Sequence, residues 1–249
     1  MPRFNLRGCD MATLIQNRPV HVGVEAATLG PAVAPATTDP NAWVRYFEEI
    51  YHRADGDTGH VPWADSHANP ALVSWLNAEA PSVIRPGAAV TVVGCGLGHD
   101  VVELAGRGYD VLGFDVSPTA IDWAKRLHPE IADRLVAADL FNLPAGLPRR
   151  ADLVVEVCTL QALHPSLREH AAQAAVTLAR PRGCVLAICR GRDEVEPLEA
   201  ATAPPYPLTC SELCGLMEAQ GWYPTRPVDD FVDDETPPKR RLRAAFKRR

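Results

Sequence analysis

The sequence lacks long hydrophobic runs, closely spaced cysteine pairs and internal repeats. No uncharged apolar stretch approaches the roughly 18 residues that a membrane-spanning helix needs, so we expect no membrane partner. Two arginines lie within the first ten residues, but no apolar stretch of about 7–15 residues follows them. This pattern argues against a signal peptide and predicts a cytoplasmic location.

Cysteine occurs seven times, but the number is odd, the spacing is irregular and no C-x-x-C pair is present. The lack of such a pair argues against a zinc ribbon or a thioredoxin-like redox site. Cys210 and Cys214 lie one helical turn apart, but no histidine or second cysteine pair completes a tetrahedral site. We therefore expect buried, reduced thiols and no metal centre.

Positive charge is not in excess either, because the formal net charge is −6. The surface as a whole therefore does not attract a nucleic-acid backbone. The C-terminal stretch KRRLRAAFKRR carries seven positive charges, but Leu242, Ala244 and Phe246 alternate within it as in a strand. We expect many of these charges to point outward and predict no nucleic-acid partner.

What is present is a globular composition of 249 residues, of which 47% are hydrophobic and 22% charged, enough for one buried core. Residues 1–40 are rich in proline and small residues, and we predict a flexible N-terminal extension there. In the segment that follows, Trp43 and Phe47 share one face of a predicted helix for which Asn41 is a plausible N-cap. We predict one folded domain over residues 41–249.

From residue 88 onward, short β-branched runs alternate with helical stretches of about 10–15 residues. This alternation predicts an α/β fold with a Rossmann-like, mostly parallel sheet that is covered by helices on both faces. Two late extended segments, near 222–231 and 240–248, are expected to close the sheet as an antiparallel hairpin. The predicted sheet has seven strands.

The most informative segment is a glycine-rich turn. A buried run over residues 89–93 leads into Gly94, Gly96 and Gly98, and a helix follows directly. Glycines let the chain turn sharply and let a ligand touch bare backbone, while the helix N-terminus supplies free N–H groups. The next predicted strand ends in Asp115, where an acid can accept hydrogen bonds from both hydroxyls of a ribose.

Two ligand classes use this geometry, and the glycine spacing separates them. Dinucleotides favour G-x-G-x-x-G, in which the third glycine makes room around a pyrophosphate. Here His99 stands at the third position and the glycine comes one place earlier, at Gly98. The G-x-G-x-G spacing favours a nucleoside with a short charged tail, so we predict S-adenosylmethionine as the cofactor. The alternatives are a nicotinamide-dependent oxidoreductase and a purely structural turn.

Later strand ends agree with a nucleoside site. Asp139 follows the third strand, where its carboxylate can accept from an adenine amino group, and Leu140 can cover the ring. The alternative for Asp139 is a helix cap or a turn residue. Glu156 lies at the end of the fourth strand, near the point where α/β sheets bind ligands. A carboxylate within a run of valines is costly to bury, which favours a functional role over a structural one.

Five segments carry a resemblance to a known family: VVGCGLGHDVVELA, VLGFDVSPTAI, AADLF, DLVVEVCTLQAL and PPYPLTCSELCGLM. They resemble class I methyltransferases, and within that class the thiopurine S-methyltransferase-like family, which includes thiol and halide methyltransferases. The cysteine inside the glycine turn and the upstream pair Pro62-Trp63 are typical of that subgroup. The resemblance covers about residues 41–249.

The resemblance implies a class I methyltransferase fold and a set of cofactor contacts. The glycine turn would approach the methionine part, and Asp115 would hold the ribose. Asp139 and Leu140 would bracket the adenine. Residues 41–79 would form a cap over the active site, with Trp63 against the cofactor. The predicted cofactor-binding residues are Trp63, Gly94, Cys95, Gly96, Asp115, Ser117, Asp139, Leu140 and Glu156.

We therefore predict an enzyme that transfers a methyl group from S-adenosylmethionine to a small molecule, at a sulfur, nitrogen or oxygen atom of a thiol or heteroaromatic compound. The further alternative is a non-catalytic S-adenosylmethionine-binding protein. The sequence leaves the acceptor and the oligomeric state open.

The need for a general base depends on the acceptor, because an acidic thiol needs none whereas a phenol or an amine can need one. The candidate catalytic residues are His164, Glu156 and Asp65. His164 is equally well explained as a residue that begins a helix. Arg190 and Arg192 end the fifth strand, either to bind an acidic substrate or as solvated turn residues.

Overall fold

This computed structural model describes residues 32–35, 37–198 and 203–249. The predicted N-terminal extension lies mainly outside the described residues. Helix α1 (Pro40–Ala54) begins with a proline, whose fixed backbone angle suits a first helical turn. Its N-cap is Asp39 and not the predicted Asn41, because Asp39 Oδ1 accepts a hydrogen bond from the Asn41 backbone N–H at 3.0 Å. Among the described residues, no helix is both long and apolar enough to cross a membrane.

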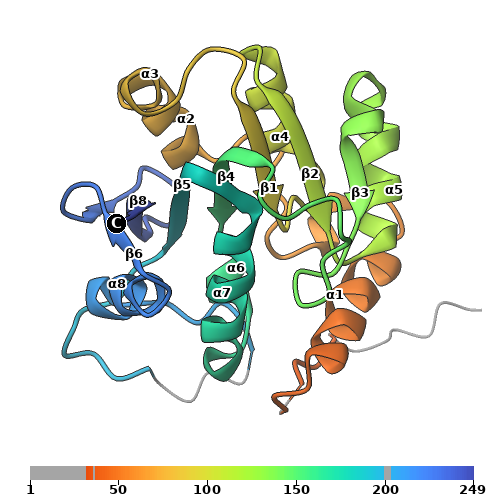
Figure 1. Ribbon diagram of the computed structural model, residues 1–249. Coiled ribbons are helices and arrows are strands. Elements are labelled where there is room, and N and C mark those ends of the chain that lie inside the picture. Colours follow the sequence, from red (N-terminus) through yellow and green to blue (C-terminus); the bar gives the residue numbers. More distant parts are fainter. Residues whose placement is uncertain (1–31, 36, 199–202) are drawn as a thin grey trace, which may run out of the picture. The chain divides into compact units, whose positions relative to one another are not determined.

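A mixed sheet forms the centre of the described unit (Figure 1). Its strands are β1 (Ala89–Val93), β2 (Asp110–Asp115), β3 (Leu135–Ala137), β4 (Ala151–Val157), β5 (Ala179–Arg190), β6 (Trp222–Pro224), β7 (Asp229–Val232) and β8 (Arg240–Arg248). The order is β3-β2-β1-β4-β5-β8-β6, and β7 also pairs with β8. The first five strands run parallel to their neighbours, and β8 runs antiparallel to β5. The predicted α/β class and mostly parallel sheet are confirmed.

The strand count is eight where we predicted seven. The segment 222–231, expected as one strand, is divided into β6 and β7, which both pair with β8. Pro227 lies in the break, and a proline cannot donate to the ladder. Because β5 occupies one edge of β8, β6 and β7 follow each other along the opposite edge. The expected antiparallel closure is therefore present, with one interruption.

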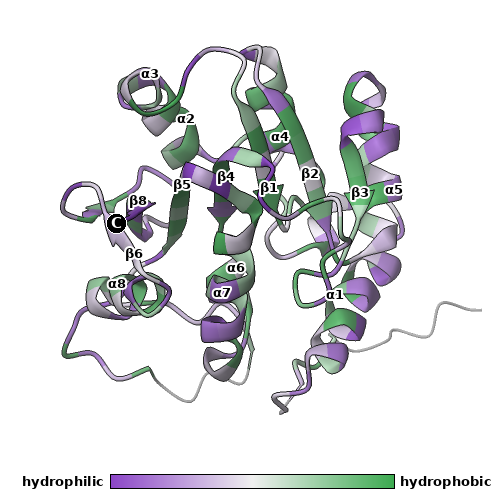
Figure 2. Cartoon of the chain, in the orientation of Figure 1, coloured by the Kyte–Doolittle hydropathy of each residue, from purple (hydrophilic) through white to green (hydrophobic). Residues whose placement is uncertain are grey.

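Helices cover both faces of the sheet. The elements besides α1 are η1 (Thr58–His60), α2 (Pro70–Ala78), α3 (Ala80–Val83), α4 (His99–Gly106), α5 (Pro118–Leu127), η2 (Pro129–Arg134), α6 (Thr159–Ala162), η3 (Pro165–Leu167), α7 (Arg168–Leu178) and α8 (Cys210–Glu218). Two buried clusters form the core, one joining α1, α7 and α8 and the other joining α2, α3 and α4. Along β4, Val154 belongs to the first cluster, whereas Leu153 and Val155 belong to the second, as strand alternation requires. Figure 2 shows the central strands as mainly hydrophobic.

The topology marks one place on the sheet for a ligand. After β1 the chain crosses to β2 on one side, whereas β4 pairs with β1 on the other side. At such a switch point the loops after neighbouring strands diverge and leave a crevice at the carboxyl ends of the strands. The glycine turn follows β1 directly, so it lies at this crevice.

Candidate active site

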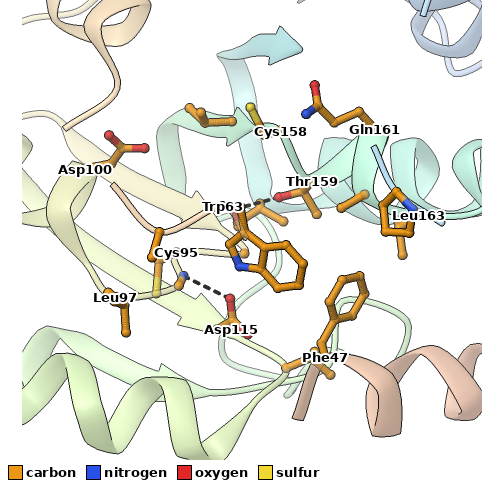
Figure 3. A pocket seen from close by; sticks show the side chains of 18 of the residues that line it. Phe47, Trp63, Cys95, Leu97, Asp100, Asp115, Cys158, Thr159, Gln161 and Leu163 are labelled. Carbon is orange, nitrogen blue, oxygen red and sulfur yellow. Dashed lines mark hydrogen bonds between the residues drawn. The ribbon is translucent and has the colours of Figure 1, made fainter. Parts of the chain in front are cut away.

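A cavity of about 320 Å³ lies at the carboxyl ends of the parallel strands. Residues from the ends of β1, β2, β4 and β5 line it, together with residues of α1 and of the loop before α2. Figure 3 shows side chains from these elements converging on one space, with the Trp63 ring at its centre. The structure thus brings the glycine turn and the predicted cap segment, residues 41–79, to the same site.

The glycine turn presents bare backbone to the cavity. Gly94 has a φ angle of +60° and Gly96 one of +51°, a region that side-chain-bearing residues rarely adopt. A Cβ atom on Gly94 would lie 2.5 Å from the hydroxyl oxygen of Thr159, and one on Gly96 would lie 3.0 Å from the hydroxyl of Tyr51. Conformation and space therefore both favour glycine at these two positions.

Asp115 connects the end of β2 to the glycine turn. Its two carboxylate oxygens accept hydrogen bonds from the backbone N–H groups of Gly96 and Ser117, each at 2.9 Å. Burial raises the pKa of Asp115, and these backbone donors act in the opposite direction. Asp115 also lines the cavity, so the acid that fixes the turn is exposed to a ligand on its other side.

Ser117, a predicted cofactor contact, is fully buried and is not among the residues that line the cavity. Its hydroxyl caps α5 by accepting from Ala120 N–H at 3.0 Å, and it donates to Glu48 at 2.6 Å. Burial acts to raise the pKa of Glu48, but the hydrogen bonds from Ser117 and Thr119 outweigh it and lower the pKa. Ser117 thus joins α1 to α5. It does not contact the cavity, so it can affect the site only by positioning these two helices.

Asp139 and Leu140 line the cavity beyond the end of β3. Oδ1 of Asp139 accepts from the Phe141 backbone N–H at 2.8 Å, so Asp139 also shapes the turn. Leu140 is buried against the core. The two interpretations of Asp139, turn residue and cavity residue, are therefore compatible.

Two hydrogen bonds hold the loop before α2 over the glycine turn. Trp63 Nε1 donates to the Tyr51 hydroxyl at 2.9 Å, and the Trp63 ring packs edge-on against Phe47 with 5.8 Å between ring centroids. The Asn69 backbone N–H donates to Asp100 Oδ1 in the first turn of α4 at 2.8 Å. Burial raises the pKa of Asp100 to about 6.

Of the three candidate catalytic residues, Asp65 lines the cavity and His164 does not. His164 Nδ1 lies 2.7 Å from the Ser166 hydroxyl at the start of η3, and its ring centroid is 6.3 Å from that of Trp43. His164 is therefore placed behind the aromatic wall of the site as a helix-entry residue.

Glu156, predicted both as a cofactor contact and as a base, is 2% exposed and does not line the cavity. Its Oε1 accepts from the Leu160 backbone N–H at 2.8 Å, and Oε2 has no hydrogen-bond partner among the described residues. Burial raises the pKa of Glu156 to about 7. Its carboxyl group therefore supports α6 from beneath and does not face the cavity.

Sequence reasoning missed two groups of cavity residues. Along α1, Trp43, Phe47 and Tyr51 recur every four residues, and all three line the cavity. The sequence places Trp43 and Phe47 on one helical face but does not mark them as cavity residues. The second group comes from the segments after β4 and around the start of β8 and consists of Cys158, Thr159, Gln161, Lys239 and Arg241. No local motif marks the second group, because the sheet brings its segments together over a separation of about 80 residues.

The donor set fits S-adenosylmethionine. The positive-φ glycines give access to backbone, the buried carboxylate of Asp115 faces the same space, and an acid and an apolar residue follow β3. Among the described residues, no group of three or more histidine, cysteine or acidic side chains is arranged to hold a metal ion.

Sequence comparison identifies related proteins. The family model described as Thiopurine S-methyltransferase (TPMT) matches residues 56–240. A probable thiol methyltransferase 2 of Arabidopsis thaliana is 26% identical over 178 residues, which cover 70% of this chain and 74% of the relative. A thiopurine S-methyltransferase of Gluconobacter oxydans is 30% identical over 153 residues, covering 55% of this chain and 65% of the relative. The second match spans less than two thirds of the relative's own length.

Solved structures show the same fold. The 1,6-didemethyltoxoflavin-N1-methyltransferase of Burkholderia thailandensis, solved with its substrate and S-adenosylhomocysteine, has a TM-score of 0.67 and 21% identity, with 88% of this chain and 93% of that chain covered. The magnesium protoporphyrin IX methyltransferase of Synechocystis, solved with S-adenosylhomocysteine, has a TM-score of 0.62 and 16% identity, with 82% and 99% covered.

Proposed function

Because the chain belongs to the thiopurine S-methyltransferase family and is an S-adenosylmethionine-dependent methyltransferase of small molecules, we propose that cofactor and acceptor meet in the cavity beside the glycine turn. Nothing in the comparisons supports a nicotinamide-dependent oxidoreductase or a non-catalytic cofactor-binding protein. The observation that carries the proposal is the pair of hydrogen bonds by which Asp115 ties the turn to the end of β2.

In this proposal the cofactor lies along the switch point between β1 and β4. The Gly94–Gly96 turn contacts the methionine part, and Asp115 accepts from the ribose hydroxyls. Asp139 and Leu140 contact the adenine. Residues 41–79 form the cap, in which Trp63 covers the cofactor and is oriented by its hydrogen bond to Tyr51.

When bound, S-adenosylmethionine supplies a sulfonium methyl group, which a lone pair of the acceptor attacks as the sulfur–methyl bond breaks and its electrons return to sulfur. Because the thioether product would be neutral, the residues of the protein would have little new charge to stabilise. The cavity walls can hold the acceptor in line and exclude water, effects worth up to about 7–11 kcal/mol in favourable intramolecular cases. Asp65 is the predicted base that lines the cavity, and we assign it this role for acceptors that must lose a proton.

The acceptor we propose is a thiol or a heteroaromatic compound. Support comes from the relatives, which are named as thiol and thiopurine methyltransferases, and from the aromatic wall of Trp43 and Phe47. A flat ring can pack against such a wall with its nucleophilic atom toward the glycine turn.

Calorimetry and product analysis test this function. S-adenosylhomocysteine should bind more tightly than NAD in isothermal titration, and mass spectrometry of assays with thiol, phenol and heteroaromatic acceptors should detect a methylated product. Tighter binding of NAD would overturn the cofactor site, and the lack of any product across the panel would contradict the acceptor class.

We also propose a cytoplasmic location, which cell fractionation tests. The described cysteines are all free, which is compatible with this location.

A further inference from the structure

The acidic and the cationic residues that line the cavity come from different elements. The acidic residues come from the loop before α2, the start of α4, the end of β2 and the segment after β3, and they are Asp65, Asp100, Asp115 and Asp139. The cations come from the end of β5 and from the start of β8, and they are Arg190, Lys239 and Arg241. Two of these acids, Asp115 and Asp139, belong to the proposed cofactor site, and the cations lie apart from it on other elements, which leaves them for the acceptor.

Arg190 and Arg241 are directly opposite each other in the antiparallel pairing of β5 with β8. Opposite residues of an antiparallel pair point to the same face of the sheet, and two like charges there destabilise the pair. Arg241 is 5% exposed. Its positive charge is compensated, because its guanidinium donates to Asp233 at 2.7 Å and also to Glu235. Lys239 also pairs with Glu235.

Arg190 has no such compensation. Its side chain lines the cavity and is half-buried, but it makes no ion pair with any acidic residue that the structure describes. Among the described residues, Asp233 and Glu235 thus compensate Lys239 and Arg241, whereas the positive charge of Arg190 has no carboxylate partner. Its neighbour Arg192, by contrast, is used by the fold, because it pairs with Glu212 and donates to the carbonyl of Pro207.

The backbone fixes where Arg190 stands. Its N–H donates to the side-chain oxygen of Gln161, and a guanidinium nitrogen of the opposing Arg241 lies 3.7 Å from the Cys158 sulfur. Figure 3 shows Cys158 and Gln161 on the α6 side of the cavity, apart from Asp115. Apolar lining residues lie near this side, among them Leu163 and the cis-linked Pro204–Pro205.

We propose that Arg190 binds an anionic group on the acceptor, and that the enzyme acts on small aromatic or heteroaromatic thiols or amines that carry a carboxylate. A guanidinium presents two parallel N–H donors that match the two oxygens of a carboxylate. The apolar walls take the ring, and the anionic group neutralises the unpaired charge beside Arg241. This inference rests on the proposed function of the cavity and names its substrate class.

The test compares 4-mercaptobenzoate with its methyl ester, which has the same ring and thiol but no negative charge. The wild-type enzyme should show a kcat/KM for the acid at least about tenfold higher than for the ester, as expected for a charged hydrogen-bonded pair. In Arg190→Gln this acid-to-ester preference should disappear, and Arg190→Lys should retain part of it because it keeps the charge without the fork. The matched control is Arg126→Gln, which removes the same charge from the exposed face of α5 and should keep the preference.

Binding separates this inference from the function on which it rests. Titration of each thiol into the enzyme saturated with S-adenosylhomocysteine should give tighter binding of the acid in wild type and equal binding in Arg190→Gln. Equal affinity for acid and ester in wild type, failure of both to bind, or an unchanged preference in Arg190→Gln would overturn the role of Arg190. If the wild-type enzyme did not bind S-adenosylhomocysteine, the proposed function itself would be overturned.

Discussion

At the residue scale, the glycine turn after β1 depends on a contact from the segment that follows the neighbouring strand β4. Thr159, the first residue of α6, donates from its hydroxyl to the Val93 carbonyl at 3.1 Å and fills the space that a Cβ on Gly94 would occupy. The loops after β1 and β4 are therefore in direct contact at the switch point. A change at Gly94 should reach α6 as well as the cofactor.

Gly94→Ala should lower S-adenosylhomocysteine affinity at least about tenfold and destabilise the fold by more than the roughly 1–2 kcal/mol that a left-handed alanine costs. Gly87→Ala is the matched control, because Gly87 has a φ of +68° but no atom within 4 Å of its would-be Cβ. Gly87→Ala should lose only the roughly 1–2 kcal/mol of stability that an alanine in the left-handed conformation costs, and its affinity for S-adenosylhomocysteine should not change. Calorimetric titration and thermal unfolding measure both, and equal behaviour of the two variants would show that the Thr159 contact is unimportant.

Glu156 makes stability depend on pH. Its pKa is raised to about 7 in the folded protein, from 4.5 in the reference state, because burial disfavours the carboxylate. Between these values the folded state holds a proton that the unfolded state has lost, so stability falls as pH rises and levels off above about 7. The total loss attributable to this group is about 3 kcal/mol.

Glu156→Gln should remove that loss. Relative to wild type, the variant should gain stability steadily between about pH 4.5 and 7, whatever fixed penalty the amide brings. Denaturant unfolding at several pH values measures the difference. Parallel pH curves for the two proteins would contradict the raised pKa.

At the scale of elements, α1 and the loop before α2 are connected by one side chain. Tyr51 of α1 is buried, accepts from Trp63 and stands 3.0 Å from where a Cβ on Gly96 would lie. One hydroxyl thus relates the helix, the loop and the glycine turn. The position of the loop should therefore depend on the hydroxyl group of Tyr51 more than on the packing of its ring.

Tyr51→Phe should weaken S-adenosylhomocysteine binding about fivefold, the value of one ordinary hydrogen bond, by releasing Trp63. Tyr46→Phe on the same helix is the control, because Tyr46 is buried but does not line the cavity. Stopped-flow quenching of tryptophan fluorescence follows the binding. A similar loss in both variants would assign the effect to helix packing.

Elements differ in how well the sequence predicts them. The run at 89–93 and the helix after Gly98 carry local signals, periodicity and glycine spacing, and both are present. Glu156 lies at the end of β4 and His164 follows it, but Glu156 is buried beneath α6 and His164 begins a helical turn. Sequence places a residue near a strand end, whereas the side it faces depends on packing with distant segments.

At the scale of the molecule, the basic C-terminal stretch is largely neutralised within the fold. Arg240 pairs with Asp193 and Asp230, and Arg243 pairs with Asp229. These acids come from the segment after β5 and from β7, so the positive stretch joins edges of the sheet. Leu242, Ala244 and Phe246 belong to one core cluster and Ala245 to the other, as the predicted strand alternation requires. The expectation that the charges point outward is wrong for Arg241, which is buried because β8 lies inside the sheet and carboxylates pair with its guanidinium.

Cofactor binding should stabilise the whole unit. S-adenosylhomocysteine at about one hundred times its Kd adds about 3 kcal/mol, which for a domain of this size raises Tm by roughly 5–10 °C. Asp115→Asn at the same ligand concentration should lose most of that increase. Differential scanning fluorimetry measures the shift, with NAD as the control ligand, and an equal shift with NAD would point to a different cofactor.

The antiparallel strand β8 has a consequence for biosynthesis. It lies between β5 and β6 in the sheet but follows every other strand in the sequence, and Arg241 within it and Lys239 just before it line the cavity. During translation the glycine turn and its neighbouring strands emerge first, while the edge of β5 stays unpaired until the segment 240–248 has left the ribosome. A chain released before that point would lack Lys239 and Arg241 in its cavity and the residue opposite Arg190. Its β5 edge would stay unpaired and prone to aggregation.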